Sequence, residues 1–264
     1  MIGDRKKMSI NLSFNESFAD TYRNPAQIAR ILTEHWVSDN MYCVNCGHEK
    51  LSHFGNNRPV ADFYCSSCQE EFELKSKNGR LGNKVVDGAY QTMLQRIHSA
   101  NNPNFFFLSY DKENMAVKDF LIIPKHYFVS DIIEKRKPLK KTARRAGWVG
   151  CSILLKEIPE TGRIFIVKDS QVIDKENVVS KWKSTEFLKE FDSNKRGWMI
   201  DVLRCIEAIS EKEFRLERVY KFEDILQVKH PQNNFIRDKI RQQLQVLRDK
   251  GVIEFISRGM YRKL

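Results

Sequence analysis

The sequence predicts an α+β protein with two domains, a larger one built around a mixed sheet and a small basic one at the C-terminus. The chain has 264 residues, long enough to form a hydrophobic core without disulfide bonds. Apolar runs and amphipathic segments alternate through the first two thirds, whereas residues 195–264 carry 16 basic and 10 acidic side chains. Apolar density falls and charge rises before residues 185–195, so we divide the chain into domains 1–190 and 191–264.

The larger domain is predicted from the periodicity of its apolar residues. Residues 24–40 place Ile28, Leu32 and Trp36 on one face of an amphipathic helix that begins near Pro25. Short apolar runs between turn residues are typical of central strands that are buried on both faces. We expect further helices at 89–100 and 130–137, strands at 105–110, 120–124, 152–158 and 163–169, and a polar, glycine-containing loop at 142–151.

The C-terminal domain shows a different pattern. We expect helices at 197–209, 213–226 and 233–251, then a hairpin at 252–264 that turns at 257–259. In the third helix Ile236, Ile240, Leu244 and Leu247 are spaced to bury one face, and Gly251 is placed to end the helix. Three helices followed by a hairpin make a winged helix, whose third helix normally enters the major groove of DNA.

The overall charge favours a polyanionic partner. The formal net charge is +11 and the isoelectric point is near 9.3. Such a surface suits phosphate contacts with counterion release, although it also fits simple solubility. No apolar run approaches the ~18 residues of a membrane span, and the N-terminus lacks the apolar stretch of a signal peptide. We therefore expect a cytoplasmic protein with no membrane partner.

Four of the six cysteines form two Cys-x-x-Cys pairs, Cys43/Cys46 and Cys65/Cys68, separated by 18 residues. This spacing is typical of structural zinc sites, in which each pair supplies two thiolates and four thiolates complete a closed tetrahedral shell. Buried or redox-active thiols would not need two matched pairs. A closed shell also leaves no open position for catalysis, so we expect zinc to be structural.

Asp62, Glu73 and Lys75 lie around the second cysteine pair with the spacing of a metal-dependent nuclease site. In a strand Glu73 and Lys75 share one face, while Phe72 and Leu74 point to the apolar side. Phosphodiester hydrolysis uses a hard cation held by carboxylates, and a lysine can orient water and offset developing charge. Alone, the pattern also fits a solvated strand face, because a short motif has a high false-positive risk.

Seven segments carry a family resemblance: "ARILTEHWV", "CVNC", "NNRPVADFYCSSCQEEFELKSK", "NNPNFFFLSY", "TARRAGWVGC", "KIRQQLQVLRDK" and the ending "YRKL". Through them the chain resembles the PD-(D/E)XK nucleases, and more closely the DpnI-type methyl-directed restriction endonucleases and the related Dam-replacing proteins. The resemblance extends from about residue 10 to residue 264. One departure from the literal signature is that Val60 and Ala61 separate Pro59 from Asp62.

The resemblance implies a restriction-endonuclease-like core of mixed sheet with an inserted four-cysteine zinc site, followed by a winged helix. It implies a type II endonuclease that cuts double-stranded GATC when its adenines are N6-methylated, with catalytic Mg²⁺ and blunt ends. Asp62 and Glu73 would be the Mg²⁺ ligands and Lys75 the catalytic lysine. Glu34, on the first helix, could add a metal contact, but we expect it to be solvated because glutamate is mostly exposed. We expect a monomer.

Two surfaces are candidates for reading methylated DNA. An N6-methyl group adds apolar surface to the major groove, and Trp148 with Arg144 and Arg145 could meet it from a basic loop. Trp148 could equally be a packed loop anchor. On the winged helix, the residues expected to address base edges are Asn234, Arg237, Arg241, Gln242 and Gln245, and those expected to hold phosphates are Arg258, Arg262 and Lys263.

Two other functions remain open from the sequence. The first is a nuclease of the same fold that is indifferent to adenine methylation. The second is a non-catalytic DNA-binding regulator with a zinc site and a winged helix, in which Asp62, Glu73 and Lys75 are surface charges. Mg²⁺-dependent cutting of methylated and unmethylated plasmid separates all three.

Overall fold

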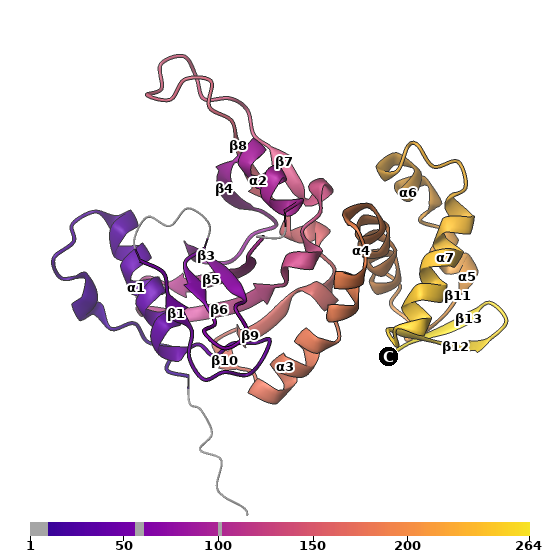
Figure 1. The fold of residues 1–264 in the computed structure, drawn as a ribbon, viewed down its shortest axis with the longest axis horizontal. Helices are drawn as coiled ribbons and strands as arrows, with labels where there is room; N and C mark the ends of the chain where they lie inside the picture. Colours follow the sequence, from indigo (N-terminus) through magenta and orange to yellow (C-terminus); the bar gives the residue numbers. More distant parts are fainter. Residues whose placement is uncertain (1–9, 56–60, 100–101) are drawn as a thin grey trace, which may run out of the picture. The chain divides into compact units, whose positions relative to one another are not determined.

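A computed structural model describes residues 10–55, 61–99 and 102–264 (Figure 1). The chain forms two compact units. The first comprises Met1–Gly82, Ala100–Lys125 and Ile164–Lys183, and the second Asn83–Ser99, His126–Arg163 and Ser184–Leu264. The predicted domain division after residue 190 stays a prediction. Within the described residues, no helix has both the length and the apolar character needed to span a lipid bilayer.

The first unit contains a seven-stranded mixed sheet in the order β1-β2-β3-β5-β6-β9-β10. Its strands are β1 (Ser52–His53), β2 (Phe63–Tyr64), β3 (Glu71–Asn78), β5 (Asn104–Asp111), β6 (Ala116–Ile123), β9 (Ile164–Lys168) and β10 (Gln171–Val172). Strands β3 and β5 pair in parallel, and the other neighbouring pairs are antiparallel. The predicted mixed sheet is confirmed.

The core of this unit is aromatic. Phe105, Phe106, Phe107 and Leu108 of β5 are all fully buried, which confirms a central strand buried on both faces. Two helices, α1 (Pro25–Asn40) and α3 (Lys175–Lys183), contribute buried side chains to the cluster on one face, with a short 3-10 helix, η1 (Glu16–Ala19), before α1. Helix α1 begins where the side chain of Asn24 accepts a hydrogen bond from the Ala26 amide.

The second unit holds an antiparallel sheet in the order β4-β8-β7. Its elements are β4 (Val85–Ala89), α2 (Tyr90–Ile97), η2 (Lys125–Tyr127, which begins in the first unit), η3 (Ser130–Ile132), β7 (Ile133–Lys135), β8 (Gly150–Ile153), η4 (Leu155–Glu157) and η5 (Glu160–Gly162). The helix predicted at 130–137 is wrong, because Ile133 and Lys135 pair with β8. The strand predicted at 152–158 ends at Ile153, and a 3-10 helix begins at Leu155.

The C-terminal part of this unit combines helices with a second antiparallel sheet, β11-β13-β12. Its elements are η6 (Glu186–Glu190), α4 (Ser193–Glu207), β11 (Glu213–Arg215), α5 (Leu216–Tyr220), α6 (Glu223–Lys229), α7 (Ile236–Asp249), β12 (Ile253–Ser257) and β13 (Met260–Lys263). The single helix predicted at 213–226 is wrong, because Phe214 pairs with Tyr261 in the sheet. The buried stripe of α7 and the C-terminal hairpin are confirmed.

Candidate active site and metal centre

Four cysteine thiols converge in the first unit. Cys43 and Cys46 lie in the turn after α1, and Cys65 and Cys68 in the turn between β2 and β3. All four sulfur atoms lie within 4.8 Å of one another, with 3.5 Å between Cys43 and Cys68 and 3.6 Å between Cys46 and Cys65. Zinc–sulfur bonds of about 2.3 Å in a tetrahedron separate the sulfurs by about 3.8 Å, so this cluster can hold a zinc ion.

The two cysteine turns have the same backbone geometry. The amide of Gly47 donates to the carbonyl of Cys43 (2.8 Å), and the amide of Gln69 donates to the carbonyl of Cys65 (2.9 Å). Gly47 and Gln69 both adopt left-handed backbone angles, with φ of 77° and 60°. Each turn therefore presents its pair of thiols in the same way, and the two turns are equivalent halves of one candidate metal site.

The pKa values of Cys43, Cys46 and Cys65 depart from that of a free cysteine thiol, in different directions. Burial raises the pKa of the Cys43 and Cys65 thiols. Burial acts in the same direction on Cys46, but hydrogen bonds from the His48 backbone and from neighbouring thiols outweigh it and lower the Cys46 pKa to about 7. A bound divalent cation favours the thiolate form at all four positions, because thiolates are the species that ligate metals.

The acidic residues and the lysine lie on the same hairpin as the second cysteine turn. Asp62 directly precedes β2, and its amide donates to the Phe72 carbonyl (3.0 Å). Its carboxylate Oδ2 accepts a hydrogen bond from the backbone amide of Leu74 (2.7 Å), which lies between Glu73 and Lys75 on β3. Those residues form an ion pair, with Lys75 Nζ 2.6 Å from Glu73 Oε1. The structure thus brings Asp62, Glu73 and Lys75 together across β2 and β3.

The pair on β3 is shielded from solvent. The side chains of Glu73 and Lys75 are only 14% and 21% exposed. Phe72 is fully buried and Leu74 packs against the core, so the predicted alternation of the strand is confirmed. Charged groups that are partly withdrawn from water interact more strongly than they do on an open surface.

Glu34 of α1 is buried, not solvated as expected. Its residue exposure is 8%, and its carboxylate lies 2.6 Å from Arg30 Nε and 3.5 Å from His53 Nε2. The hydrogen bond and the charge of Glu34 raise the pKa of Arg30, and the charge of Asp62 acts in the same direction. Burial depends on tertiary contacts, so the prediction of a solvated Glu34, which was made from residue type alone, was wrong.

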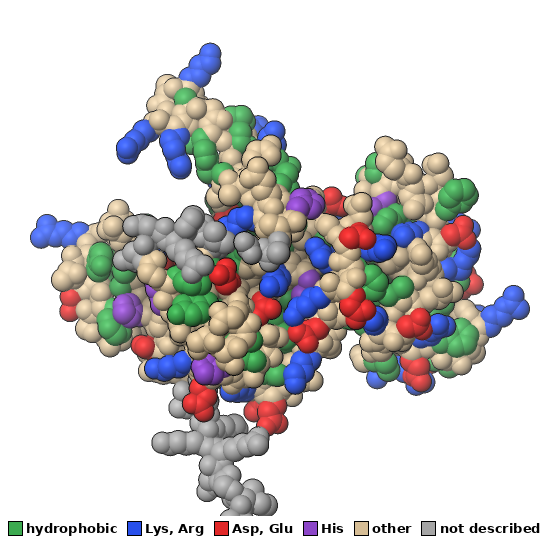
Figure 2. Space-filling view, in the orientation of Figure 1, with side chains coloured by type: hydrophobic (Ala, Val, Ile, Leu, Met, Phe, Trp, Pro, Cys, Tyr) green, Lys and Arg blue, Asp and Glu red, His purple; other side chains and the backbone are tan. Residues whose placement is uncertain are grey.

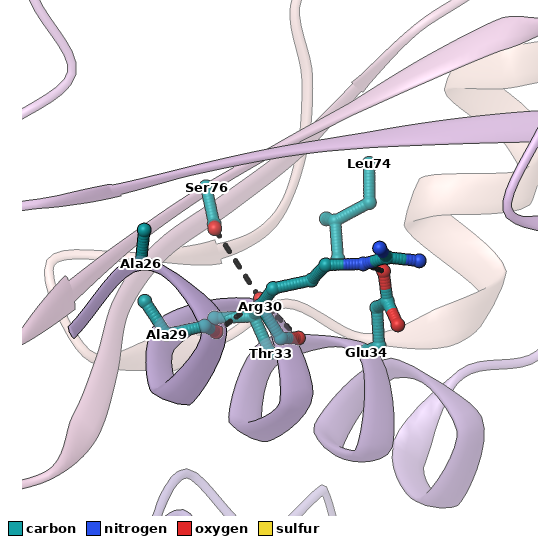
Figure 3. A pocket seen from close by; sticks show the side chains of 7 residues that line it. All are labelled: Ala26, Ala29, Arg30, Thr33, Glu34, Leu74 and Ser76. Carbon is teal, nitrogen blue, oxygen red and sulfur yellow. Dashed lines mark hydrogen bonds and ion pairs between the residues drawn. The ribbon is translucent and has the colours of Figure 1, made fainter. Parts of the chain in front are cut away.

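Arg30, the partner of Glu34, was not singled out from the sequence. Figure 3 shows its side chain reaching toward Glu34. Both residues line a pocket of ≈ 230 Å³. Leu74 and Ser76 of β3 line the same pocket, and Ser76 Oγ lies 3.3 Å from Thr33 Oγ1 of α1. The i, i+4 spacing of Arg30 and Glu34 was the available signal for this pair.

Arg144, Arg145 and Trp148 lie in the connection between β7 and β8. This segment, residues 136–149, carries six basic and no acidic side chains, and we call it the basic arm. Lys and Arg side chains project from it in Figure 2. The Arg145 guanidinium lies 4.7 Å from the Trp148 ring centre. A Cβ atom at Gly150 would come within 2.8 Å of the Trp148 ring, so the tryptophan packs closely over that glycine.

The predicted reading face of α7 is exposed. It comprises Arg237, Arg241, Gln242 and Gln245; Asn234 is also exposed but lies before the helix, which begins at Ile236 and not at residue 233 as predicted. Arg258 is also exposed, in the turn of the hairpin. Arg262, by contrast, lies 2.8 Å from Glu213 and 2.9 Å from Glu254, and Lys263 donates to the Ile209 carbonyl. Arg262 and Lys263 already have partners within the domain, so a DNA phosphate would have to displace those partners to bind either side chain.

The chain combines a mixed sheet, a four-cysteine cluster, a shielded acid–lysine pair and a basic, helical C-terminal part, a combination expected of a protein that acts on DNA. The model of the Dam-replacing family matches residues 10–191, and the model of the Dam-replacing HTH domain matches residues 194–263. The chain therefore belongs to the Dam-replacing family and is of the DpnI type. This membership indicates a methylation-dependent nuclease with a helix-turn-helix domain that binds DNA.

Proposed function

We propose that the protein is a methyl-directed type II restriction endonuclease that hydrolyses double-stranded DNA at GATC when the adenine is N6-methylated, and leaves blunt ends. The observation that carries the proposal is the assembly of Asp62, Glu73 and Lys75 across β2 and β3 in a chain of the Dam-replacing family. In this proposal the first unit is a PD-(D/E)XK core and the C-terminal domain is a winged helix.

Asp62 and Glu73 would hold Mg²⁺, because carboxylate oxygens are the ligands that this hard cation prefers. When bound, the ion supplies Lewis-acid stabilisation at the scissile phosphate. The hydrogen bond from the Leu74 amide orients the Asp62 carboxylate relative to β3. The four cysteines would hold zinc in a structural role, because their closed shell leaves no open coordination position.

Lys75 would act on the attacking water. Its ammonium group lies beside Glu73 in a partly buried position, so it can donate a hydrogen bond to a water molecule at the phosphate. Its positive charge also offsets the negative charge that grows on the phosphate oxygens in the transition state. In the same proposal Trp148 and the basic arm of residues 136–149 contact methylated DNA together with α7.

The experiment uses one plasmid prepared with and without N6-methyladenine in GATC, incubated with the protein and Mg²⁺. We expect cutting of the methylated form alone, at GATC, with blunt termini in the sequenced fragments. A Lys75→Ala variant and a reaction with a magnesium chelator are the controls, and neither should cut. Equal cutting of both plasmids would refute methyl direction, and absence of cutting would favour a regulator without nuclease activity.

A further inference from the structure

Tyr220, the last residue of α5, contacts two arginines of α7. Its hydroxyl oxygen accepts a hydrogen bond from Arg241 Nη1 at 2.8 Å. The guanidinium carbon of Arg237 lies 5.2 Å from the centre of its ring. One tyrosine therefore holds both side chains, the first through its hydroxyl and the second through its aromatic face.

Each of these arginines also has a carboxylate partner. Arg237 Nε lies 2.7 Å from Glu223 Oε2 on α6, and Arg241 pairs with Asp238. The hydrogen bond that Arg241 donates to Tyr220 raises the pKa of Arg241 above its ordinary value. Both guanidinium groups are oriented by partners on two sides.

The pair occupies one exposed face of the helix. Arg237 and Arg241 are four residues apart, about 6 Å along the axis of an α-helix, and project from the same side. Their side chains are 59% and 49% exposed. An arginine that is held by partners within the protein but still has exposed N–H donors can bind a guanine edge in bidentate fashion, through O6 and N7.

From this geometry we propose that Tyr220 is a positioning residue that fixes Arg237 and Arg241 as a pre-oriented pair for recognition of guanine in the DNA target. The inference rests on the proposed function, because it takes α7 as the DNA-reading helix. Tyr220 acts through the arginines and touches no base.

The carboxylates give the pair its selectivity. Glu223 and Asp238 already satisfy the two charges, so an isolated phosphate offers the arginines little that they lack. A guanine edge presents O6 and N7 as two acceptors in the plane of the guanidinium and so distinguishes one base from another, whereas a phosphate contact carries no sequence information. Partners that compete within the protein weaken contacts with unrelated sequences and thereby increase discrimination.

The test measures binding of the full chain, without Mg²⁺, to a methylated GATC duplex that contains either guanine or 7-deazaguanine, which lacks the N7 acceptor. For the wild type we expect roughly ten- to a hundredfold tighter binding to the guanine duplex. Tyr220→Phe keeps the ring and removes the hydroxyl, and should reduce that preference by roughly three- to tenfold. Tyr22→Phe, at an exposed tyrosine of the first unit, is the matched control and should change nothing.

A double-mutant cycle separates positioning from a general effect on folding. If Tyr220 acts through Arg241, Tyr220→Phe should have no further effect on the guanine preference in an Arg241→Gln background. An unchanged preference in Tyr220→Phe would overturn the inference, and so would a full effect that persists without Arg241. A wild type that binds methylated GATC no better than an unrelated duplex would instead overturn the proposed function, and the inference with it.

Removal of the two carboxylate charges should raise affinity for unrelated DNA, whereas Tyr220→Phe should lower affinity for the guanine-containing target. A variant with Glu223→Gln and Asp238→Asn frees both arginines for phosphates, so we expect severalfold tighter binding to an unrelated duplex and a smaller preference for GATC. Asp249→Asn, an exposed carboxylate of α7 that pairs with Arg248, is the control. Equal affinity of the double variant and the wild type for the unrelated duplex would refute the role given to these carboxylates.

Discussion

The cysteine hairpin (Asp62, β2, the Cys65–Cys68 turn and β3) and the exposed face of α7 hold their candidate functional side chains by different means. In the hairpin, backbone hydrogen bonds fix Asp62 against β3, and Glu73 is only 14% exposed. On α7, Arg237 and Arg241 are about half exposed and are held by side-chain partners. The difference teaches that the candidate catalytic geometry depends on the fold of a short segment, whereas the candidate reading surface depends on ion pairs that can exchange with DNA.

Removal of zinc ligands should disrupt the hairpin most. For Cys65→Ser we expect loss of bound zinc, a large loss of stability of the first unit and loss of cleavage, because structural zinc contributes about 10–16 kcal/mol in small zinc-folded peptides. Metal analysis and thermal unfolding measure the first two effects. Cys205→Ala, at a buried cysteine of α4 outside the cluster, is the control and should retain zinc. Normal zinc content and normal folding in Cys65→Ser would contradict a structural metal.

Loss of a carboxylate in the same hairpin should affect chemistry without affecting folding. Glu73→Gln keeps the shape of the side chain and removes its charge, so we expect cleavage to fall by at least about a thousandfold, as for loss of a preorganised charge in an active site. Zinc content and binding of methylated duplex should stay near wild type. Single-turnover cleavage measures the effect.

Lys77→Ala provides the matched control for Glu73→Gln, because Lys77 lies on the same face of β3, two residues beyond Lys75, and is exposed. Its cleavage rate should stay within about tenfold of wild type, the range of an outer electrostatic contact. Similar losses in both variants would show that the charge of the whole strand face, and not the pair at Glu73 and Lys75, controls the reaction.

The cysteine hairpin was more predictable from the sequence than the C-terminal domain. Two matched cysteine pairs and a period of two along β3 are local signals, and the cysteine cluster and the strand alternation are both confirmed. The catalytic roles of Asp62, Glu73 and Lys75 stay predictions. The buried stripe and end of α7 were also readable, because helical spacing and Gly251 are local features.

What the sequence could not supply depends on contacts between distant residues. Phe214 joins a strand because it pairs with Tyr261, 47 positions later, so residues 213–226 do not form one helix. Glu34 is buried because His53 and Arg30 surround its carboxylate. Tyr220 carries no motif, and its contacts with two arginines of α7 appear only in the folded domain. Periodicity describes single elements, whereas these features arise between elements.

A buried ionic contact of the helix-turn-helix domain should make its stability depend on pH. Asp201 of α4 is 5% exposed and lies 2.6 Å from Lys229 Nζ and 2.9 Å from His230 Nε2. Burial acts to raise the pKa of Asp201, but the hydrogen bond from His230 and the charge of Lys229 outweigh it and lower the pKa. A lowered pKa stabilises the folded state above the ordinary value of about 3.9, and this stabilisation is lost as pH falls through the folded pKa.

Asp201→Asn should therefore destabilise the domain by about 3 kcal/mol at neutral pH, because it removes the buried carboxylate charge that contacts Lys229 and His230. It should also flatten the dependence of stability on pH below about 4. The fluorescence of Trp198, whose ring stacks on His230 at 3.7 Å, reports unfolding of this region. Asp249→Asn, in an exposed pair with Arg248, should cost less than about 1 kcal/mol. Equal losses in the two variants would contradict a special role for the buried contact.

The smallest expected effect concerns the left-handed residues of the two cysteine turns. Gly47→Ala should cost about 1 kcal/mol, because φ is 77° and a Cβ atom there would meet nothing closer than 4.0 Å, so backbone strain is the main penalty. Gln69→Gly removes such strain, but it loses the hydrogen bond from the Gln69 side-chain amide to the Ser66 carbonyl and increases the conformational entropy of the unfolded chain. We therefore expect the free energy of unfolding to change by about zero. Denaturant unfolding of the zinc-loaded protein compares the two variants. A larger loss for Gln69→Gly than for Gly47→Ala would show that side-chain contacts, and not backbone angles, maintain the matched geometry of the turns.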